Sequence, residues 1–330
     1  MNDEVSRLSA RRPALLARAA ILRAVRGWFD AEGFLEVETP ARVPAPGQET
    51  HLEAIEASEP GQPRRWLVTS PEYHMKRLVA GGLPRIVQIG KAWRGQEHGA
   101  HHQPEFTMIE WYRAHAPLEA IAADCEALLR VAVDAAAASG WARVPSLPQS
   151  FTHTSVAALF RQHVGIDLTG GESALALAAK LAAAGVSTGT AHHWDDIFFQ
   201  VFLDKIEPAL ARSQPIFVFD WPAPLGALAR RKDDDPRLCE RFELYAGGLE
   251  LANAFGELTD PREQRARFAA ESAARAALGR TVYPVDENLL TALARMPPTA
   301  GVALGFDRLV MFALGATDIR DVIAFAADEA

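Results

Sequence analysis

Cysteine is scarce in this chain of 330 residues, which contains only Cys125 and Cys239. The two form no Cys-x-x-Cys motif, so a zinc site built from cysteines and a small domain held together by disulfides are both excluded. Long apolar runs are also missing, and arginines interrupt the apolar residues near the N-terminus. We therefore expect neither a membrane span nor a secretory signal, and a reducing cytoplasmic location.

Basic residues are outnumbered: 34 Lys and Arg stand against 42 Asp and Glu, a net charge of −8. This balance argues against a protein that mainly coats nucleic acid. Hydrophobic residues make up 49% and charged residues 23%, as in soluble globular proteins. No GxGxxG, P-loop or HExxH motif occurs, so the common nucleotide-binding and zinc-protease signatures are absent.

Hydrophobic periodicity predicts the order of the elements. An amphipathic helix is expected over residues 14–32, ended by Gly33, and a second helix between Pro117 and Gly140. The first helix is read from the spacing of Leu15, Ala19, Leu22, Val25 and Phe29. Strand character occurs at residues 34–39, 66–69, 86–93, 106–113, 216–221, 241–245, 249–256 and 301–305, and a helix begins at Phe306.

Residues 141–215 are less regular, with helical patterns at 172–184 and 195–212, and we interpret them as a helical insertion. The strands are joined by hairpins and long helical segments rather than by a repeated strand–helix–strand rhythm. The sequence therefore predicts one α+β domain over residues 1–330, with an antiparallel sheet flanked by helices.

Polar side chains occur on strands that are otherwise apolar. In residues 106–113, alternation places Glu110 and Tyr112 on one face with Phe106 and Met108. A carboxylate and a phenol beside apolar side chains would form a pocket for a cation. An edge strand with Glu110 in solvent is the alternative, and this strand alone leaves both open.

Three glutamates, Glu243, Glu250 and Glu257, lie in an apolar segment that is typical of a β-hairpin, with its turn at residues 246–248. Asn253 and Phe255 share a face with Glu257 by the two-residue period of a strand. Unpaired buried carboxylates are costly, and Mg²⁺ held by one or two of them plus phosphate oxygens would stabilise them. A solvated hairpin is the alternative.

Arginines stand at two places where an anion could bind. Gly305 and Arg308 lie at a strand-to-helix junction, where glycine permits close approach and a helix start favours negative charge, although an ordinary glycine turn would look similar. Arg94 ends an apolar strand before a loop, residues 95–103. That loop contains His98, His101 and His102. Without a fourth ligand, these histidines favour a mobile polar loop over a zinc site. Together, the two arginines, the clustered glutamates and the pocket for a cation indicate an enzyme that acts by positioning a polyphosphate.

Together these segments resemble the catalytic core of class II aminoacyl-tRNA synthetases, in particular lysyl-tRNA synthetase. Residues 33–40, 94–106 and 301–308 look like motifs 1, 2 and 3, and residues 69–76 and 243–260 are similar to lysine-branch signatures. The chain begins at motif 1, where lysyl-tRNA synthetases carry a preceding anticodon-binding barrel. We therefore expect a chain without that barrel, similar to the paralogues that attach (R)-β-lysine to elongation factor P.

The resemblance implies a homodimer, built through motif 1, that uses ATP and Mg²⁺ to activate β-lysine or lysine and transfers it to a lysine of elongation factor P. Neither tRNA nor a membrane is an expected partner. The resemblance implies that Arg94 binds the α-phosphate, Arg308 the γ-phosphate, and that Phe106 stacks on adenine. The other implied ATP-binding residues are Gln96, Glu97, Gln103, Glu243, Leu244 and Gly305. The implied amino-acid pocket consists of Ser70, Pro71, Glu72, Glu110, Tyr112, Glu250, Asn253, Phe255, Glu257 and Ala303, and Glu243 and Glu250 would hold the metal.

Three residues depart from the lysyl-tRNA synthetase pattern. Gln96 replaces a glutamate that reads the adenine amino group, and its carbonyl can still accept that hydrogen bond. Gln103 replaces an asparagine and is one methylene longer. Ala303 replaces a glycine, and we expect its methyl group to discriminate between lysine isomers.

Two other functions stay open. One is a stand-alone lysyl-tRNA ligase that uses acceptor-stem contacts only. The excess of acidic over basic residues argues against it. The other is a non-catalytic, synthetase-like regulatory subunit. Retention of Arg94, Arg308, Glu243 and Glu250 argues against the second, since an inactive site has no need of charges so costly to bury.

Overall fold

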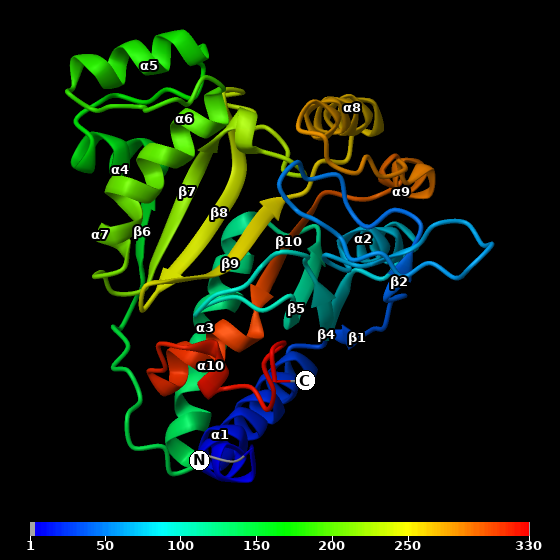
Figure 1. Cartoon of the computed structure of the whole chain (residues 1–330), viewed down its shortest axis with the longest axis vertical. Helices are drawn as coiled ribbons and strands as arrows, with labels where there is room; N and C mark the ends of the chain where they lie inside the picture. The colour runs from blue at the N-terminus through cyan, green and yellow to red at the C-terminus, as the bar shows by residue number, and fades with distance from the viewer. Residues whose placement is uncertain (1–3, 330) are drawn as a thin grey trace. The chain divides into compact units, whose positions relative to one another are not determined.

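The computed structural model describes residues 4–329 and divides into two compact units (Figure 1). Unit 1 comprises Met1–Ser146 and Thr259–Ala330, and unit 2 comprises Leu147–Leu258. In the described part of the chain, no helix has both the length and the apolar character that a membrane span requires. The single-domain organisation and the insertion at residues 141–215 remain predictions.

Four strands of unit 1 lie side by side in the order β1 (Leu35–Glu36), β4 (Arg85–Trp93), β5 (Glu105–Ala114) and β10 (Thr299–Gly305). β4 and β10 flank β5 on either side and are antiparallel to it, whereas β1 runs parallel to β4. Because β5 is not an edge strand, Glu110 is only 1% exposed, so the alternative that placed this carboxylate in solvent is wrong. Two short strands, β2 (Arg42–Val43) and β3 (Trp66–Leu67), form a separate antiparallel pair.

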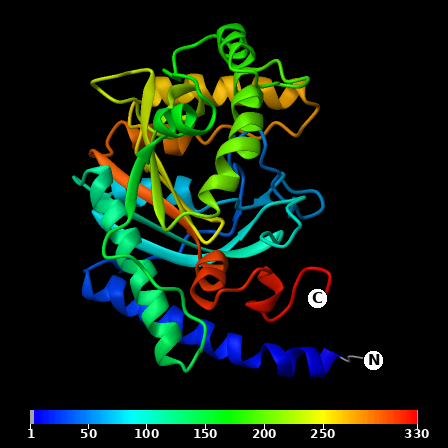
Figure 2. The ribbon, with the colours of Figure 1, turned by 90° about the vertical axis from the view of Figure 1, so that its left-hand side faces the viewer.

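The two long helices predicted in unit 1 are confirmed as α1 (Glu4–Ala31) and α3 (Leu118–Ala138), which pack against each other (Figure 2). α1 begins before Pro13 rather than after it. Its buried residues are Ala14, Ala17, Ile21, Val25 and Phe29. The expected face was therefore wrong at Leu15, Ala19 and Leu22, which are half-buried, because the buried stripe follows steps of three and four from Ala14.

Over the described residues, the remaining α-helices of unit 1 are α2 (Glu72–Ala80), α8 (Pro261–Ala277), α9 (Glu287–Leu293) and α10 (Phe306–Leu314). α10 begins directly after β10, which confirms the predicted strand-to-helix junction. α2 packs against α9, and α9 against α8. These contacts bring the segment after residue 259 back onto the N-terminal part of the unit.

Unit 2 has four strands in the order β9 (Leu249–Gly256), β8 (Leu238–Ala246), β7 (Ile216–Pro222) and β6 (Thr152–Ser155). β8 pairs antiparallel with β7 and β9, and β6 runs parallel to β7. The predicted hairpin turn is confirmed, with φ of 60° at Gly247 and 82° at Gly248. Two parallel pairs, β1–β4 and β6–β7, thus make the fold mostly rather than wholly antiparallel.

Helices beside β6 and β7 form the rest of unit 2 (Figure 1). They are α4 (Val156–His163), α5 (Ala174–Ala183), α6 (Trp194–Val201), a π-helical turn at Phe202–Ile206, and α7 (Glu207–Leu210). The helical patterns predicted at 172–184 and 195–212 are confirmed. Their apolar faces and strand residues such as Val218 and Trp221 form one buried core.

Candidate active site

Glu110 is the centre of a polar group in unit 1. Its carboxylate accepts hydrogen bonds from the hydroxyl groups of Ser70, at 2.6 Å, and Tyr112, at 2.7 Å. Tyr112 lies two residues along β5 and shares the face of Glu110, as alternation predicts. Ser70 comes from the loop before α2, and its hydroxyl also accepts from the backbone amide of Glu72 at 3.1 Å. Residues predicted to line the amino-acid pocket are therefore in direct contact.

Ala303 lies next to this group. It is opposite Glu110 in the register of β10 and β5, and Gln88 is opposite Glu110 in the register of β4 and β5. Side chains directly opposite in antiparallel strands project from the same face. Gln88, Glu110 and Ala303 thus form one row across three strands. Gln88 was not predicted, because only the pairing of the strands brings it here.

Pro71 and Glu72 lie at the start of α2, with Pro71 at the N-cap position. The carboxylate of Glu72 lies 2.6 Å from the ammonium group of Lys76, one helical turn further on. Both residues are buried. A negative charge is favoured at a helix N-terminus, and the lysine offsets part of the cost of burying it. The signature at residues 69–76 therefore fixes a carboxylate beside Ser70.

Arg94 follows β4 directly and packs against Phe106 of β5. Its guanidinium carbon lies 5.2 Å from the centre of the Phe106 ring. Its Nε donates to the carbonyl of Thr69 at 3.4 Å, and a terminal nitrogen lies 3.9 Å from the carboxylate of Glu97. Since Thr69 precedes Ser70, the residues predicted for ATP adjoin those predicted for the amino acid within unit 1.

Arg308 lies in the first turn of α10, after Gly305. Its guanidinium donates to the carbonyl of His101 at 3.3 Å and lies 2.5 Å from the imidazole of His102. Over residues 4–329, the three histidines of this loop do not gather into a metal-binding group. The loop therefore contacts Arg308 through His101 and His102, and the choice of a polar loop over a zinc site stays a prediction.

The two glutamines that depart from the family pattern differ in their surroundings. Gln96 is exposed and has a φ of 66°, in the left-handed region that few residues other than glycine adopt. Gln103 is buried, and its side-chain carbonyl accepts a hydrogen bond from the backbone amide of Ala327 at 2.9 Å. Gln103 thus ties motif 2 to the C-terminal segment, and its contact with ATP stays a prediction.

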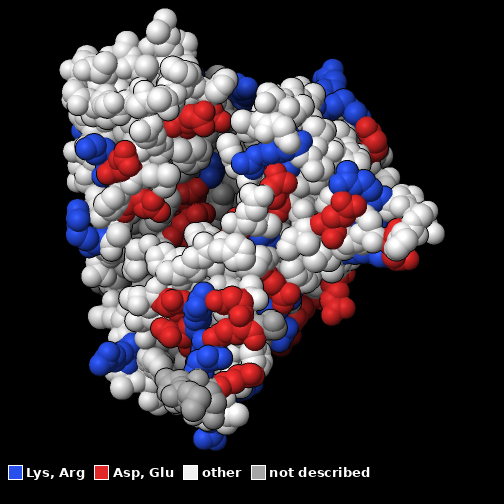
Figure 3. Space-filling view, in the orientation of Figure 1, with Lys and Arg blue, Asp and Glu red and all other residues white. Residues whose placement is uncertain are grey.

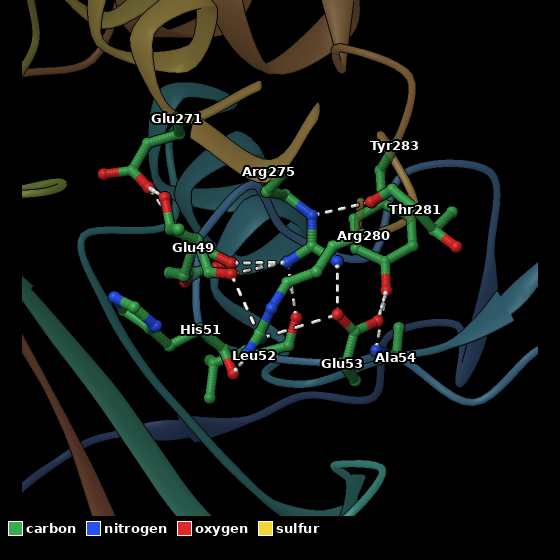
Figure 4. Close-up of polar contacts among 11 residues, drawn as sticks. Glu49, His51, Leu52, Glu53, Ala54, Glu271, Arg275, Arg280, Thr281 and Tyr283 are labelled. Atoms are coloured by element: carbon green, nitrogen blue, oxygen red, sulfur yellow. Dashed lines mark hydrogen bonds and ion pairs between the residues drawn. The ribbon is translucent and has the colours of Figure 1, made fainter. Parts of the chain in front are cut away.

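Residues 48–54, which the sequence analysis did not select, are held by α8 and the loop after it (Figure 4). Arg275 of α8 is fully buried and donates to the carbonyl groups of Glu49 and Leu52, each at 2.7 Å. It also donates to the carboxylate of Glu53 at 3.0 Å and packs 4.4 Å from the ring centre of Tyr283. The Tyr283 hydroxyl donates to the same carboxylate at 3.2 Å. This segment is therefore fixed from several directions.

We expect Arg275→Lys to lower the free energy of unfolding by about 2 kcal/mol, because one ammonium group cannot reach all the acceptors that the planar guanidinium reaches. Urea denaturation would measure the change. Arg265→Lys is the matched control, since Arg265 lies on the same helix in an exposed pair with Glu287, and we expect about 0.5 kcal/mol or less. Equal small losses in both variants would contradict a structural role for Arg275.

In unit 2, Glu243 of β8 is buried among polar side chains. Arg241 donates to its Oε1 atom at 2.6 Å, and the hydroxyl of Tyr245 donates to its Oε2 atom at 2.5 Å. Arg241 also donates to Asn253 of β9 at 3.2 Å and lies 4.3 Å from the ring centre of Trp221. Glu243 and Asn253 were predicted, but Arg241 was not, although it connects them.

The pKa of Glu243 is raised to about 7, first by burial and then by the negative charge of Glu250, while Arg241 and Tyr245 oppose the shift. The two glutamates are thus close enough to repel each other, and a cation bound to both would relieve this repulsion. Of the other predicted residues in this unit, Leu244 is fully buried, Phe255 is half-buried and Glu257 is 1% exposed. The Leu244 side chain belongs to the core, and its contact with ATP stays a prediction.

Comparison with known proteins agrees with the resemblance of the motifs. Residues 5–329 match the family described as class II tRNA synthetases (D, K and N). The chain is 42% identical, over 98% of its length and 97% of the relative's, to an elongation factor P–(R)-β-lysine ligase of Enterobacter sp. (strain 638). Proteins of the same name from Salmonella dublin and Salmonella paratyphi B are 41% identical over the same shares. The predicted similarity to these ligases is therefore confirmed, and the chain belongs to the class II tRNA synthetases (D, K and N).

Proposed function

We propose that this chain is an ATP-dependent ligase that activates (R)-β-lysine, or lysine, and transfers it to a lysine side chain of elongation factor P in the cytoplasm. The observation that carries the proposal is the 42% identity to the Enterobacter ligase over nearly the full length of both chains. The polar groups around Glu110 and Glu243 support it, because they provide carboxylates suited to ammonium groups and to a metal ion.

In the activation step, the carboxylate of the amino acid attacks the α-phosphorus of ATP and pyrophosphate leaves. Negative charge grows on the α-phosphate oxygens, and the guanidinium of Arg94 would neutralise it through two parallel hydrogen bonds. Arg308 would hold the γ-phosphate in place, and Phe106 would stack on adenine. In the transfer step, the uncharged amine of the acceptor lysine attacks the carbonyl carbon of the adenylate, AMP leaves, and the amine loses a proton.

Glu243 and Glu250 would hold Mg²⁺. Carboxylate oxygens are the ligands this ion prefers, and the raised pKa of Glu243 reflects a burial cost and a repulsion that a cation would reduce. The ion, when bound, would neutralise charge on the phosphates of ATP.

We expect Ala303→Gly to shift the preference from β-lysine toward lysine by about 1–3 kcal/mol in kcat/KM, because a methyl group beside Glu110 would be removed from the pocket. ATP–pyrophosphate exchange with each isomer would measure the preference. Ala300→Gly, on the same strand, is the control. An unchanged ratio between the isomers would contradict a discriminating role for Ala303.

We also propose a homodimer formed through residues 33–40. β1 lies at the edge of the strands of unit 1, and Leu35 on it is 51% exposed, so both its backbone and an apolar side chain are available for association. Light scattering would give the molar mass in solution. A chain that stays monomeric at micromolar concentration would contradict the dimer.

The main test is the intact mass of elongation factor P after incubation with this chain, ATP, Mg²⁺ and either isomer. We expect a mass gain of one lysyl group, larger with β-lysine. A lysine tRNA serves as the parallel acceptor, because the rival function is a stand-alone tRNA ligase. On the face drawn in Figure 3, basic and acidic side chains are interspersed. Charged tRNA without a change in the protein's mass would overturn the proposal, and absence of ATP–pyrophosphate exchange would favour a non-catalytic subunit.

A further inference from the structure

Glu49, on the segment that Arg275 holds, carries a carboxylate for which the proposed function has no role. Its Oε2 atom is buried and accepts a hydrogen bond from no residue in the range 4–329. The other acidic side chains in Figure 4 differ in this respect: Glu271 accepts from the backbone amide of Thr50 at 2.8 Å, and Glu53 accepts from Arg275. A buried carboxylate oxygen without a donor is costly, and a bound ligand that donates a hydrogen bond to it would remove this cost.

The carboxylate of Glu49 faces the part of unit 1 where ATP and amino acid are expected. A β-carbon added at Gly47 would lie 2.5 Å from its Oε2 atom and 3.1 Å from the hydroxyl of Thr69, so the carboxylate and Thr69 both lie beside the position that a side chain at Gly47 would occupy. Burial and the negative charge of Glu72 raise the pKa of Glu49, while its own backbone amide and Arg94 lower it. Glu49 is thus within electrostatic reach of both Glu72 and Arg94.

Its position is fixed by the backbone. The carbonyl of Glu49 accepts from Arg275, and the side-chain amide of Gln48, the preceding residue, donates to the carbonyl of Pro284 at 2.9 Å. On the other side, Glu271 accepts from the amide of Thr50. A carboxylate held in this way loses little conformational entropy when it binds a ligand, which favours selective recognition.

We propose that Glu49 is a specificity residue, which binds the ammonium group nearest the reacting carboxylate: the 3-ammonium of β-lysine or the 2-ammonium of lysine. The inference rests on the proposed function, which places the substrate carboxylate beside Arg94. An ammonium group one or two carbons from that carboxylate lies close to Arg94, as Glu49 does, whereas the 6-ammonium is several carbons away. Glu49 supplies a charge-assisted hydrogen bond there.

The test compares Glu49→Gln with wild type in ATP–pyrophosphate exchange. We expect the KM for β-lysine and for lysine to rise about 10-fold or more, the loss of one charge-assisted hydrogen bond, with the KM for ATP changed less than about two-fold. As a competitive inhibitor, 6-aminohexanoate lacks the nearer ammonium group, so its Ki should be equal in both enzymes. Glu49→Asp, which keeps the charge, should recover part of the loss.

Glu56→Gln is the matched control, since Glu56 lies further along the same stretch of chain in an exposed pair with Arg64 at 2.7 Å, and we expect no change in any KM. Unchanged KM values in Glu49→Gln, or an equal loss for β-lysine and 6-aminohexanoate, would overturn the inference. Failure of the wild-type chain to form an adenylate from either isomer would instead overturn the proposed function.

Discussion

Replacing Arg94 by alanine is expected to lower the rate of adenylate formation by about 100-fold or more, comparable to the loss of one oxyanion donor in other enzymes. The structure gives this arginine few alternative roles. Its side chain is 26% exposed, and its only charged neighbour among the described ion pairs is Glu97 at 3.9 Å. The guanidinium is therefore available to a phosphate while Phe106 supports it from one side. ATP–pyrophosphate exchange would measure the loss.

A lysine at position 94 tests the positive charge of Arg94 separately from the planar geometry of its guanidinium. Arg94→Lys keeps one positive charge but cannot form two parallel hydrogen bonds, so its rate should lie between wild type and Arg94→Ala. Arg42→Ala is the control for loss of an arginine from unit 1, because Arg42 is exposed and paired with Glu59. Exchange close to wild type in Arg94→Ala would show that this residue does not stabilise the transition state, and motif 2 would then need another assignment.

Local sequence patterns identified the elements whose burial follows a simple period. β4, β5, β9 and the junction of β10 with α10 lie where alternation and glycine placed them. α8 was missed because the residues it buries are Gln264, Phe268 and Arg275, which give almost no apolar periodicity. A helix that is held mainly by polar contacts has no apolar stripe, so hydrophobic periodicity does not predict it.

The residues of the candidate site also divide into those that a local sequence pattern identifies and those that it does not. Glu110, Tyr112, Glu243 and Asn253 could be selected because each is a polar residue on an apolar strand, and the resemblance to a family assigned them roles. Other residues around the site could not be selected from the sequence. Arg275 and the segment it holds are separated by more than 200 positions in the chain, so no local pattern connects them. Gln88 enters its row only through the strand register.

Arg241→Met is expected to lower the free energy of unfolding by about 3–5 kcal/mol, because it removes one partner of a buried ion pair and leaves the other behind. Arg241 donates to Glu243, to Asn253 and to the carbonyl of Leu225, the last at 2.6 Å. Arg237→Met is the control: Arg237 is exposed and paired with Asp235, and we expect a loss of about 1 kcal/mol or less. Urea denaturation without magnesium would measure the loss in both variants.

The loss in Arg241→Met should also depend on pH. The folded-state pKa of Glu243, about 7, lies above its ordinary value of 4.5, so this group destabilises the folded chain as pH rises from 4.5 through 7. Arg241 lowers this pKa, and without it the folded carboxyl keeps its proton to higher pH. The penalty therefore continues to grow above pH 7 in the variant, after it has levelled off in wild type. The difference in stability should be larger at pH 8 than at pH 6, and a difference that is equal at both values would mean that Arg241 stabilises unit 2 through its packing on Trp221 rather than through the charge of Glu243.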